Sequence, residues 1–591
     1  MAISAGEESI IKKLNRLYQE GSQARARISE GWKDAIEVMK GNVWPARRPK
    51  YKVNAVMNFL AEIIERKAGL LTDSRPSIMV VSRKEIDDPL CEILQKTIEG
   101  ILDERNFEQK LLEFVMLEEY FGFAAFNTCF DKNLDYGDGD IDLVVVDPRS
   151  FIFDPFVTRS WNLQYGEYCC FESIQPTDLL ISKYGRKEDI KPNFNEIDLK
   201  QDSLASKIRQ FFGYDKTSSN LSQSVIPRSL VRDWWVKDRQ SKDGDNLKFP
   251  TWRHLIEAGG CIVEDGANPY IDGNHPFDGM DWTFNVDSAY GRNEIDYLKS
   301  PQVMFNKVLA AILENAILMG NGIWIGDRDA LTKEEWERLT NEPGSIIKIK
   351  PGRVLKRDTP PALPNYMINT CELLTQGMEK LSGITEVTEG RRPGQVTSGV
   401  AIESLAIMAQ TTLRLKARQL EGMLQRIGQK LISRIFAYYT TDRVFNLVGP
   451  DAEIKSFLFE REKIRTQIKK LGGIPEALKT YQFKVVPTSS LAMTQWQKGL
   501  MATQLFQLGL IDEEAALDAL NFPGRKQIMS RMKEKKMEEV GLMNEAASIE
   551  GDLKGEGGGG FGRKKTPQRM PANLLRGTPH KETGMQYPTK Q

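Results

Sequence analysis

Residue types that carry catalytic or metal-binding chemistry are few in this chain. The three histidines, His254, His275 and His580, do not lie at ligand spacing from a cysteine or from one another. None of the six cysteines forms a CxxC pair, so we expect reduced thiols rather than a metal centre. The chain contains neither a GxxxxGK[ST] phosphate-binding loop nor a GxSxG nucleophile turn. The sequence therefore predicts no catalytic residue, no metal site and no cofactor.

One acidic segment partly resembles a calcium-binding loop, which supplies oxygen ligands at fixed offsets. The residues at ligand-like offsets are Asp131, Asn133, Asp135 and Asp142. Tyr136 occupies the place where such a loop requires glycine. We interpret 135–140 as a polar turn between two hairpin strands, 124–130 and 141–146.

The length and charge of the chain favour a globular protein with several substructures. It has 591 residues, with 81 basic and 81 acidic side chains and a formal net charge of +0. A single core stops growing near ~250–300 residues, and a neutral total gives no sign of a general nucleic-acid binder. No apolar signal segment is visible, and the best apolar stretch, 308–319, is interrupted by Glu314. We expect no membrane association.

Two helices and the insert between them organise the rest of the chain. Apolar residues at helical spacing predict a helix at 294–321 and a return helix at 366–383. A loop, 388–395, leads into a third helix of about forty residues that begins at Thr397, far longer than the mean of ~11. The insert, 322–364, reads as a small α/β unit.

Within the insert, short strands are expected at 323–325, 345–349 and 353–357. Thr332 and Glu335 match a capping box, in which the two side chains satisfy the first free amides of a helix. A short helix is therefore predicted after Thr332.

The stretch 1–289 reads as a mixed α+β layer. We expect 190–225 to be a polar loop excursion and 268–282 to be irregular. Helices are predicted at 9–40, 53–71, 90–105, 107–120 and 176–184, and strands at 78–81, 124–130, 141–146, 165–172, 229–237, 249–256 and 261–264.

Beyond the long helix, a charged helix is expected at 460–470 and a strand at 481–486. Three further helices are expected between 495 and 539. From Glu550 the composition shifts to glycine, proline and basic residues, which predicts a tail that cannot build a core.

Several short motifs, taken in order along the chain, resemble those of one family. They are Val146-Asp147-Pro148-Arg149-Ser150-Phe151 with Phe153-Asp154-Pro155, Tyr290-Gly291-Arg292-Asn293-Glu294 with Gln302 and Asn306, Glu389-Gly390 with Pro393-Gly394, and Thr397-Ser398-Gly399-Val400-Ala401-Ile402. With a small insert between two helices, this order resembles the portal proteins of tailed bacteriophages, and it covers most of the chain.

The resemblance implies an α+β portal fold with defined parts. These are a wing at 1–289, a first stem helix at 290–321, a clip at 322–364, a second stem helix at 365–387, a tunnel loop at 388–396, a long wing helix and wing return at 397–490, a helical crown at 491–549 and a flexible basic tail at 550–591.

The resemblance also implies a function and partners. The expected assembly is a homo-oligomeric ring, a dodecamer, formed in the host cytoplasm and placed at one vertex of the virion capsid. Double-stranded DNA is packaged, retained and ejected through its channel. The large terminase subunit and then a head-to-tail adaptor dock on the clip, while the wing meets the major capsid and scaffolding proteins. The alternatives are a metal-dependent nucleic-acid enzyme and another structural head or tail protein of a phage.

Three groups of candidate site residues follow. The DNA-facing candidates of the tunnel loop are Gly390, Arg391, Arg392, Pro393, Gly394 and Gln395. The channel-lining candidates are Glu314, Glu372 and Glu379, because an acidic lumen does not grip phosphates. The partner-binding candidates of the clip are Trp324, Trp336, Lys348, Lys350 and Arg353.

The long helix also carries a basic ridge, opposite its apolar stripe. The ridge consists of Arg414, Arg418, Arg426, Lys430 and Arg434. We expect these side chains to form ion pairs between subunits, with DNA contact as the alternative.

Overall fold

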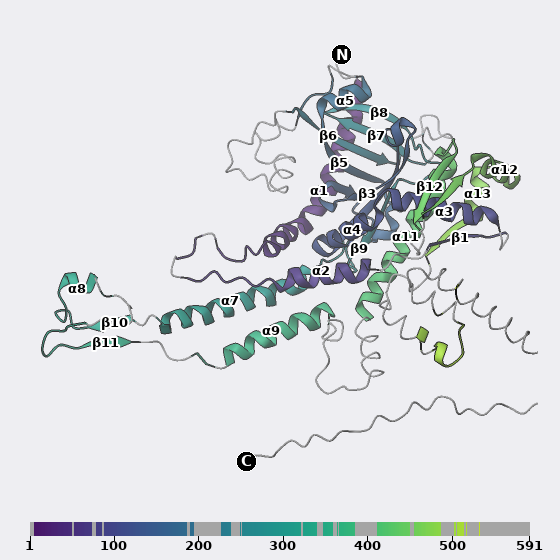
Figure 1. Ribbon diagram of the computed structural model, residues 1–591. Helices are drawn as coiled ribbons and strands as arrows, with labels where there is room; N and C mark the ends of the chain where they lie inside the picture. The colour runs from purple at the N-terminus through teal and green to yellow at the C-terminus, as the bar shows by residue number, and fades with distance from the viewer. Residues whose placement is uncertain are drawn as a thin grey trace, which may run out of the picture. The chain divides into compact units, whose positions relative to one another are not determined.

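The computed structural model shows a mixed α+β protein, as the sequence predicted. The chain divides into a large compact unit, 1–504, and a second unit, 505–591. The structure describes residues 5–485 apart from 46, 50–51, 74–77, 85–87, 186–188, 194–225, 238–248, 250, 321–322, 338, 340–346, 359–362, 365, 385–410 and 449–453, together with 502–503, 505–512, 516 and 531. All elements named below belong to the large unit (Figure 1).

Four helices open the chain, and their ends follow from local sequence. They are α1 (Ala5–Met39), α2 (Phe59–Thr72), α3 (Pro89–Glu104) and α4 (Phe107–Phe121). The Asp88 carboxylate accepts a hydrogen bond from the Leu90 amide, which caps α3. Helix α4 ends at Gly122, whose φ of +79° suits glycine.

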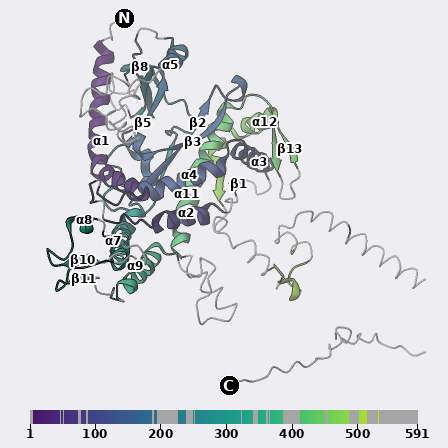
Figure 2. The same cartoon turned by 60° about the vertical axis from the view of Figure 1, so that its left-hand side comes forward.

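A five-stranded antiparallel sheet in the order β4-β5-β6-β7-β8 forms one layer. Its strands are β4 (Phe151–Phe153), β5 (Tyr168–Pro176), β6 (Arg228–Val236), β7 (Arg253–Ala258) and β8 (Cys261–Ala267), and α5 (Thr177–Tyr184) follows β5. Helix α1 packs along this sheet, where Leu14 and Tyr18 join a buried cluster with Trp234 (Figure 2).

A second sheet has the order β3-β2-β9, and both α4 and α11 pack on it. Its strands are β2 (Phe123–Asp131), β3 (Asp140–Val146) and β9 (Phe277–Asp281), and α11 spans Thr411–Tyr438. Apolar side chains of α11, including Leu420, Ile427 and Ile435, enter the largest buried cluster together with Phe114 and Phe126. This core holds α11 in place.

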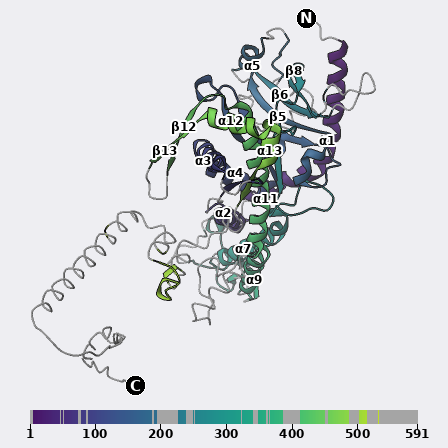
Figure 3. The ribbon, with the colours of Figure 1, turned by 90° about the vertical axis from the view of Figure 1, so that its right-hand side faces the viewer.

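The chain after α11 returns to the same core. Strands β12 (Arg443–Val448) and β13 (Ile454–Phe459) form a hairpin, and α12 (Arg461–Leu471) and α13 (Ile474–Thr480) follow it (Figure 3). Strand β14 (Tyr481–Val485) then pairs antiparallel with β1 (Ile78–Ser82). The pairing joins two segments about 400 residues apart, Ser82 opposite Tyr481.

Helices α7 (Ile295–Gly320) and α9 (Tyr366–Ser382) run side by side (Figure 1). Between them in sequence lie β10 (Ile323–Gly326), α8 (Lys333–Glu337) and β11 (Leu355–Asp358). Strands β10 and β11 pair antiparallel, with Trp324 opposite Arg357. The Thr332 amide donates to the Glu335 carboxylate at 2.8 Å, so the capping box is confirmed.

Most predicted helices and strands are confirmed, but some predictions were wrong. The segment 268–282, expected to be irregular, contains β9. Asp278, Gly279 and Asp281 are unfavourable in strands, so the local sequence did not indicate one, and pairing with β2 holds them in place. Residues 347–349, the described part of the strand expected at 345–349, form no strand. Strands β12 and β13 and helix α13 were not predicted. The three helices expected between 495 and 539 and the tail lie almost wholly outside the described residues.

Candidate functional site

The start of α7 is fixed by a contact between two glycines. A Cβ on Gly291 would lie 2.8 Å from the Thr283 carbonyl oxygen and closer still to that of Gly122. Real Cβ atoms essentially never approach within 3.0 Å, so only glycine fits. The Trp282 amide donates to the Gly122 oxygen at 2.9 Å, and Thr283 and Arg292 exchange backbone hydrogen bonds. The end of α4 and the start of α7 are thereby locked together.

The two residues before α7 add polar anchors. The Asn293 side-chain oxygen accepts from the Asp296 amide at 2.7 Å and caps the helix. The buried Glu294 carboxylate binds Lys67 Nζ at 2.6 Å and Trp282 Nε1 at 2.8 Å. The motif 290–294 is thus explained as a joint that sets the direction of α7.

An extended strap, residues 52–59, is bound along α7 by three polar side chains. Gln302 accepts from the Phe59 amide at 3.1 Å and donates to the Met57 oxygen at 2.6 Å. Asn306 accepts from the Met57 amide at 3.1 Å. Glu314 accepts from the Val53 amide at 3.1 Å and from Lys52 Nζ at 2.9 Å. The strap tethers α7 well beyond its first turn.

The far half of α7 and much of α9 present apolar side chains to solvent. Ile317 is 52% exposed and Leu373 is 69% exposed. Within the described residues, one helix segment, Ile295–Met319, is long and apolar enough by composition to cross a membrane. Its first half packs into the core through Leu298, and Glu314 forms ion pairs. A protein surface rather than a membrane is therefore expected to contact the exposed half of this segment.

The three channel-lining candidates have different surroundings. Glu314 is paired with Arg48 at 3.2 Å and Lys52 at 2.9 Å, and these partners lower the pKa of its carboxyl. Glu372 is exposed on α9. The sequence placed Glu379 on the same helix face as Glu372, but Glu379 lines a cavity beside α2. That these three residues line a channel stays a prediction. If Glu314 lines it, the two basic side chains that pair with Glu314, Arg48 and Lys52, lie there as well.

The clip candidates lie near one another around the β10–β11 hairpin. Trp324 and Trp336 are half-buried, and the Trp336 ring lies near Gly326. Lys348 and Lys350 are exposed, and Arg353 forms a 3.6 Å ion pair with Asp329. The tunnel-loop candidates 390–395 lie outside the described residues.

The expectation that the basic ridge of α11 forms ion pairs between subunits was wrong for three of its five members, which pair within the chain. Lys430 is buried and pairs with Asp278 at 2.8 Å, and Arg426 lies 3.7 Å from the same carboxylate. Arg434 is fully buried, 2.7 Å from Asp272 and stacked on an aromatic ring. This side of α11 packs on β9 and the loop before it, whose carboxylates neutralise the ridge. Arg414 and Arg418 are exposed.

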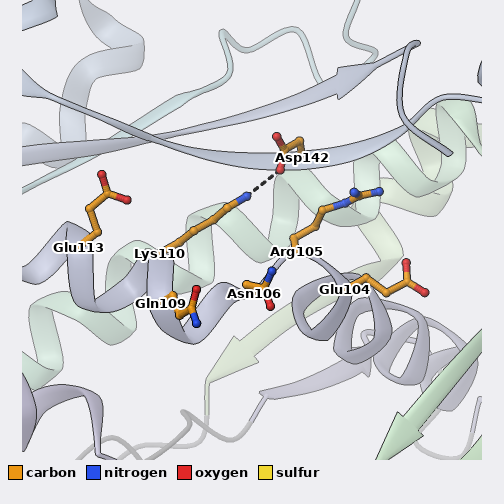
Figure 4. A pocket seen from close by; sticks show the side chains of 7 residues that line it. All are labelled: Glu104, Arg105, Asn106, Gln109, Lys110, Glu113 and Asp142. Carbon is orange, nitrogen blue, oxygen red and sulfur yellow. Dashed lines mark hydrogen bonds and ion pairs between the residues drawn. The ribbon is translucent and has the colours of Figure 1, made fainter. Parts of the chain in front are cut away.

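The acidic turn has its side chains committed within the chain. Asp142 binds Lys110 at 2.8 Å and Asp135 binds Arg443 at 3.2 Å. Among the described residues, no group of three or more His, Cys, Asp or Glu side chains could hold a metal. A cavity beside the turn between α3 and α4 is lined by Glu104, Arg105, Asn106, Gln109, Lys110, Glu113 and Asp142 (Figure 4). Both basic side chains of this cavity bind carboxylates: Lys110 binds Asp142 and Arg105 binds Asp140.

Sequence reasoning missed the residues that surround the α7 start. Trp282 and Glu118 are fully buried there, and Lys67 bridges from α2. A buried tryptophan eight residues before a glycine-containing motif gave no signal by itself. The two adjacent glutamates of α4 gave no signal either, because charged residues are mostly exposed and their burial here depends on the surrounding elements.

Fold and site together comprise two paired helices, a small unit between them and a braced start of the first helix. The family model for phage P22-like portal proteins matches residues 16–549. The chain therefore belongs to the P22-like portal protein family. A comparison with curated proteins finds none that matches. Membership indicates a structural role in an oligomeric ring at the capsid vertex, with capsid and terminase interactions in general terms.

Proposed function

We propose that the chain forms a dodecameric ring whose channel admits, retains and releases double-stranded DNA. In this proposal α7 and α9 are the two stem helices and 322–364 is the clip. The observation that carries it is the α7–α9 pair, joined through a small α/β unit, within a chain matched by a portal family model. Helix α7 has 26 residues, which corresponds to a wall of about 39 Å at 1.5 Å per residue.

The exposed apolar residues of α7 and α9 support assembly around an axis. Exposure to solvent is unfavourable for apolar side chains such as Met304, Ile317 and Leu373, and packing between neighbouring subunits would bury them. The tunnel loop 388–396 is proposed to face DNA, since it separates α9 from the long helix. Residues 491–549 are proposed as a crown and 550–591 as a basic tail.

The proposed partners would bind different parts of the ring at different stages. The clip, through Trp324, Trp336, Lys348, Lys350 and Arg353, is proposed to bind the large terminase subunit and later a head-to-tail adaptor. The wing is proposed to meet the major capsid and scaffolding proteins, after assembly in the host cytoplasm.

Negative-stain imaging of the purified full chain tests this function. The expected result is a closed ring with a central channel, as cyclic assembly produces, and with about twelve-fold symmetry as proposed. Monomers that cleave nucleic acid in the presence of Mg²⁺ would instead establish the enzyme alternative. A compact oligomer without a channel would indicate another structural head or tail protein.

A further inference from the structure

Two adjacent glutamates of α4 are buried without a hydrogen-bond partner. Glu118 and Glu119 are each 0% exposed, and neither oxygen of either side chain meets a donor. An ionised carboxylate in such a place is very unfavourable, so the group holds a proton instead. Burial accordingly raises the pKa of both carboxyls well above their ordinary value.

Charged groups from every surrounding element face this pair. They are Lys67 of α2, Asp281 of β9, Glu294 before α7 and Lys416 of α11. Lys67 binds Glu294, and Asp281 accepts from the Ser160 hydroxyl. With both glutamates protonated, the two lysines balance the two remaining carboxylates. Loss of one proton leaves a buried negative charge without a counter-ion.

Lys416 is the cation that is free to respond. Its Nζ donates to the Thr283 hydroxyl at 3.0 Å and lies 4.7 Å from the centre of the Trp282 ring. It is only partly buried, whereas Lys67 is held at 2.6 Å by Glu294. Desolvation lowers the pKa of Lys416 to about 8. Lys416 lies in the second turn of α11 as described, just after 385–410.

We propose that Glu118 and Glu119 form a proton-operated switch in which loss of a proton draws Lys416 from Thr283 to the α4 carboxylates. The proton leaves to solvent, and the ammonium group then pairs with the carboxylate left behind. The move shifts the first turns of α11 relative to α4 and to the start of α7. Proton binding at this junction is thereby linked to the segment that joins α9 to α11.

Amine labelling of the full chain between pH 6 and pH 8.5 tests the movement. The labelling rate of Lys416 is measured by mass spectrometry, and Lys463, which is exposed on α12, serves to confirm that the reagent is active at each pH. An amine with a lowered pKa that stayed on Thr283 would label faster as pH rises. The switch instead predicts that the Lys416 labelling rate falls with rising pH in the wild type. It predicts a rise in Glu118→Gln, because a neutral amide attracts no ammonium group.

Two further variants keep the test decisive if Glu118→Gln does not fold. Thr283→Val removes the alternative partner of Lys416, so the fall in labelling should begin at lower pH. Glu113→Gln, an exposed position of the same helix, should keep the wild-type profile. A Lys416 labelling rate that rises with pH in the wild type and in Thr283→Val overturns the proposal. Ring formation at constant pH is a separate measurement, so this failure leaves the portal function standing.

Discussion

Substitution of Gly291 by alanine should destabilise the large unit by about 1–3.5 kcal/mol. The new Cβ would lie 2.8 Å from the Thr283 oxygen and 2.9 Å from Asp281 Cβ, and still nearer the Gly122 oxygen. Two of these neighbours are backbone atoms that cannot rotate away. Overpacking of this kind costs about 1–3 kcal/mol, and a strained backbone hydrogen bond of the Thr283–Arg292 bridge adds about 1 kcal/mol. The loss of glycine's unfolded-state freedom returns about 0.4–1 kcal/mol.

Urea unfolding at one fixed protein concentration measures the effect, since ring assembly would otherwise change the apparent stability. The midpoint should fall while the m-value stays unchanged. Gly422→Ala is the matched control: this glycine lies inside α11 with nothing within 4 Å of the added Cβ. It should gain up to about 1 kcal/mol from helix propensity. A Gly291→Ala protein as stable as the wild type would refute the argument that the two glycines lock α4 to α7.

Four further outcomes are expected. Gln302→Ala removes two of the hydrogen bonds that hold the strap to α7, so the strap should be cleaved faster by protease and the unit should lose about 2 kcal/mol in urea unfolding. Trp324→Ala should reduce terminase binding in a pull-down without loss of rings, because the half-buried ring lies in the small hairpin unit. Gly390→Val should leave rings intact but lower the DNA content of particles, if a positive φ is needed there. Arg391→Ala with Arg392→Ala should weaken the salt dependence of DNA retention, and an unchanged dependence would exclude phosphate contact.

The pH dependence of stability has a defined sign at the α4 glutamates. Their pKa values are raised in the folded state, so the folded chain binds more protons than the unfolded chain above the ordinary pKa of about 4.3. Stability should therefore fall as pH rises from there toward the raised values, by at most about 1.4 kcal/mol per pH unit for each group. Glu119→Gln should flatten this fall in thermal unfolding.

Sequence periodicity alone predicted the helices and strands that a local pattern can specify. The helices α3, α4, α7, α9 and α12 lie within one or two residues of the predicted ranges at most ends. Caps and repeated apolar residues are local, so they need no tertiary information. The motif 290–294 with Gln302 and Asn306 was also visible, together with the family that it resembles, although its physical role was not.

Tertiary structure decided which polar residues face inward. Arg426, Lys430 and Arg434 were expected to pair with neighbouring subunits, because helical spacing shows that they share a face but not what covers that face. The carboxylates that neutralise them, Asp272 and Asp278, lie about 150 residues away in a segment expected to be irregular. Strand β9 forms because it pairs with β2. The α4 glutamates are buried because α2, α7 and α11 meet over them. Such long-range pairings depend on the whole fold, and no local stretch of sequence encodes them.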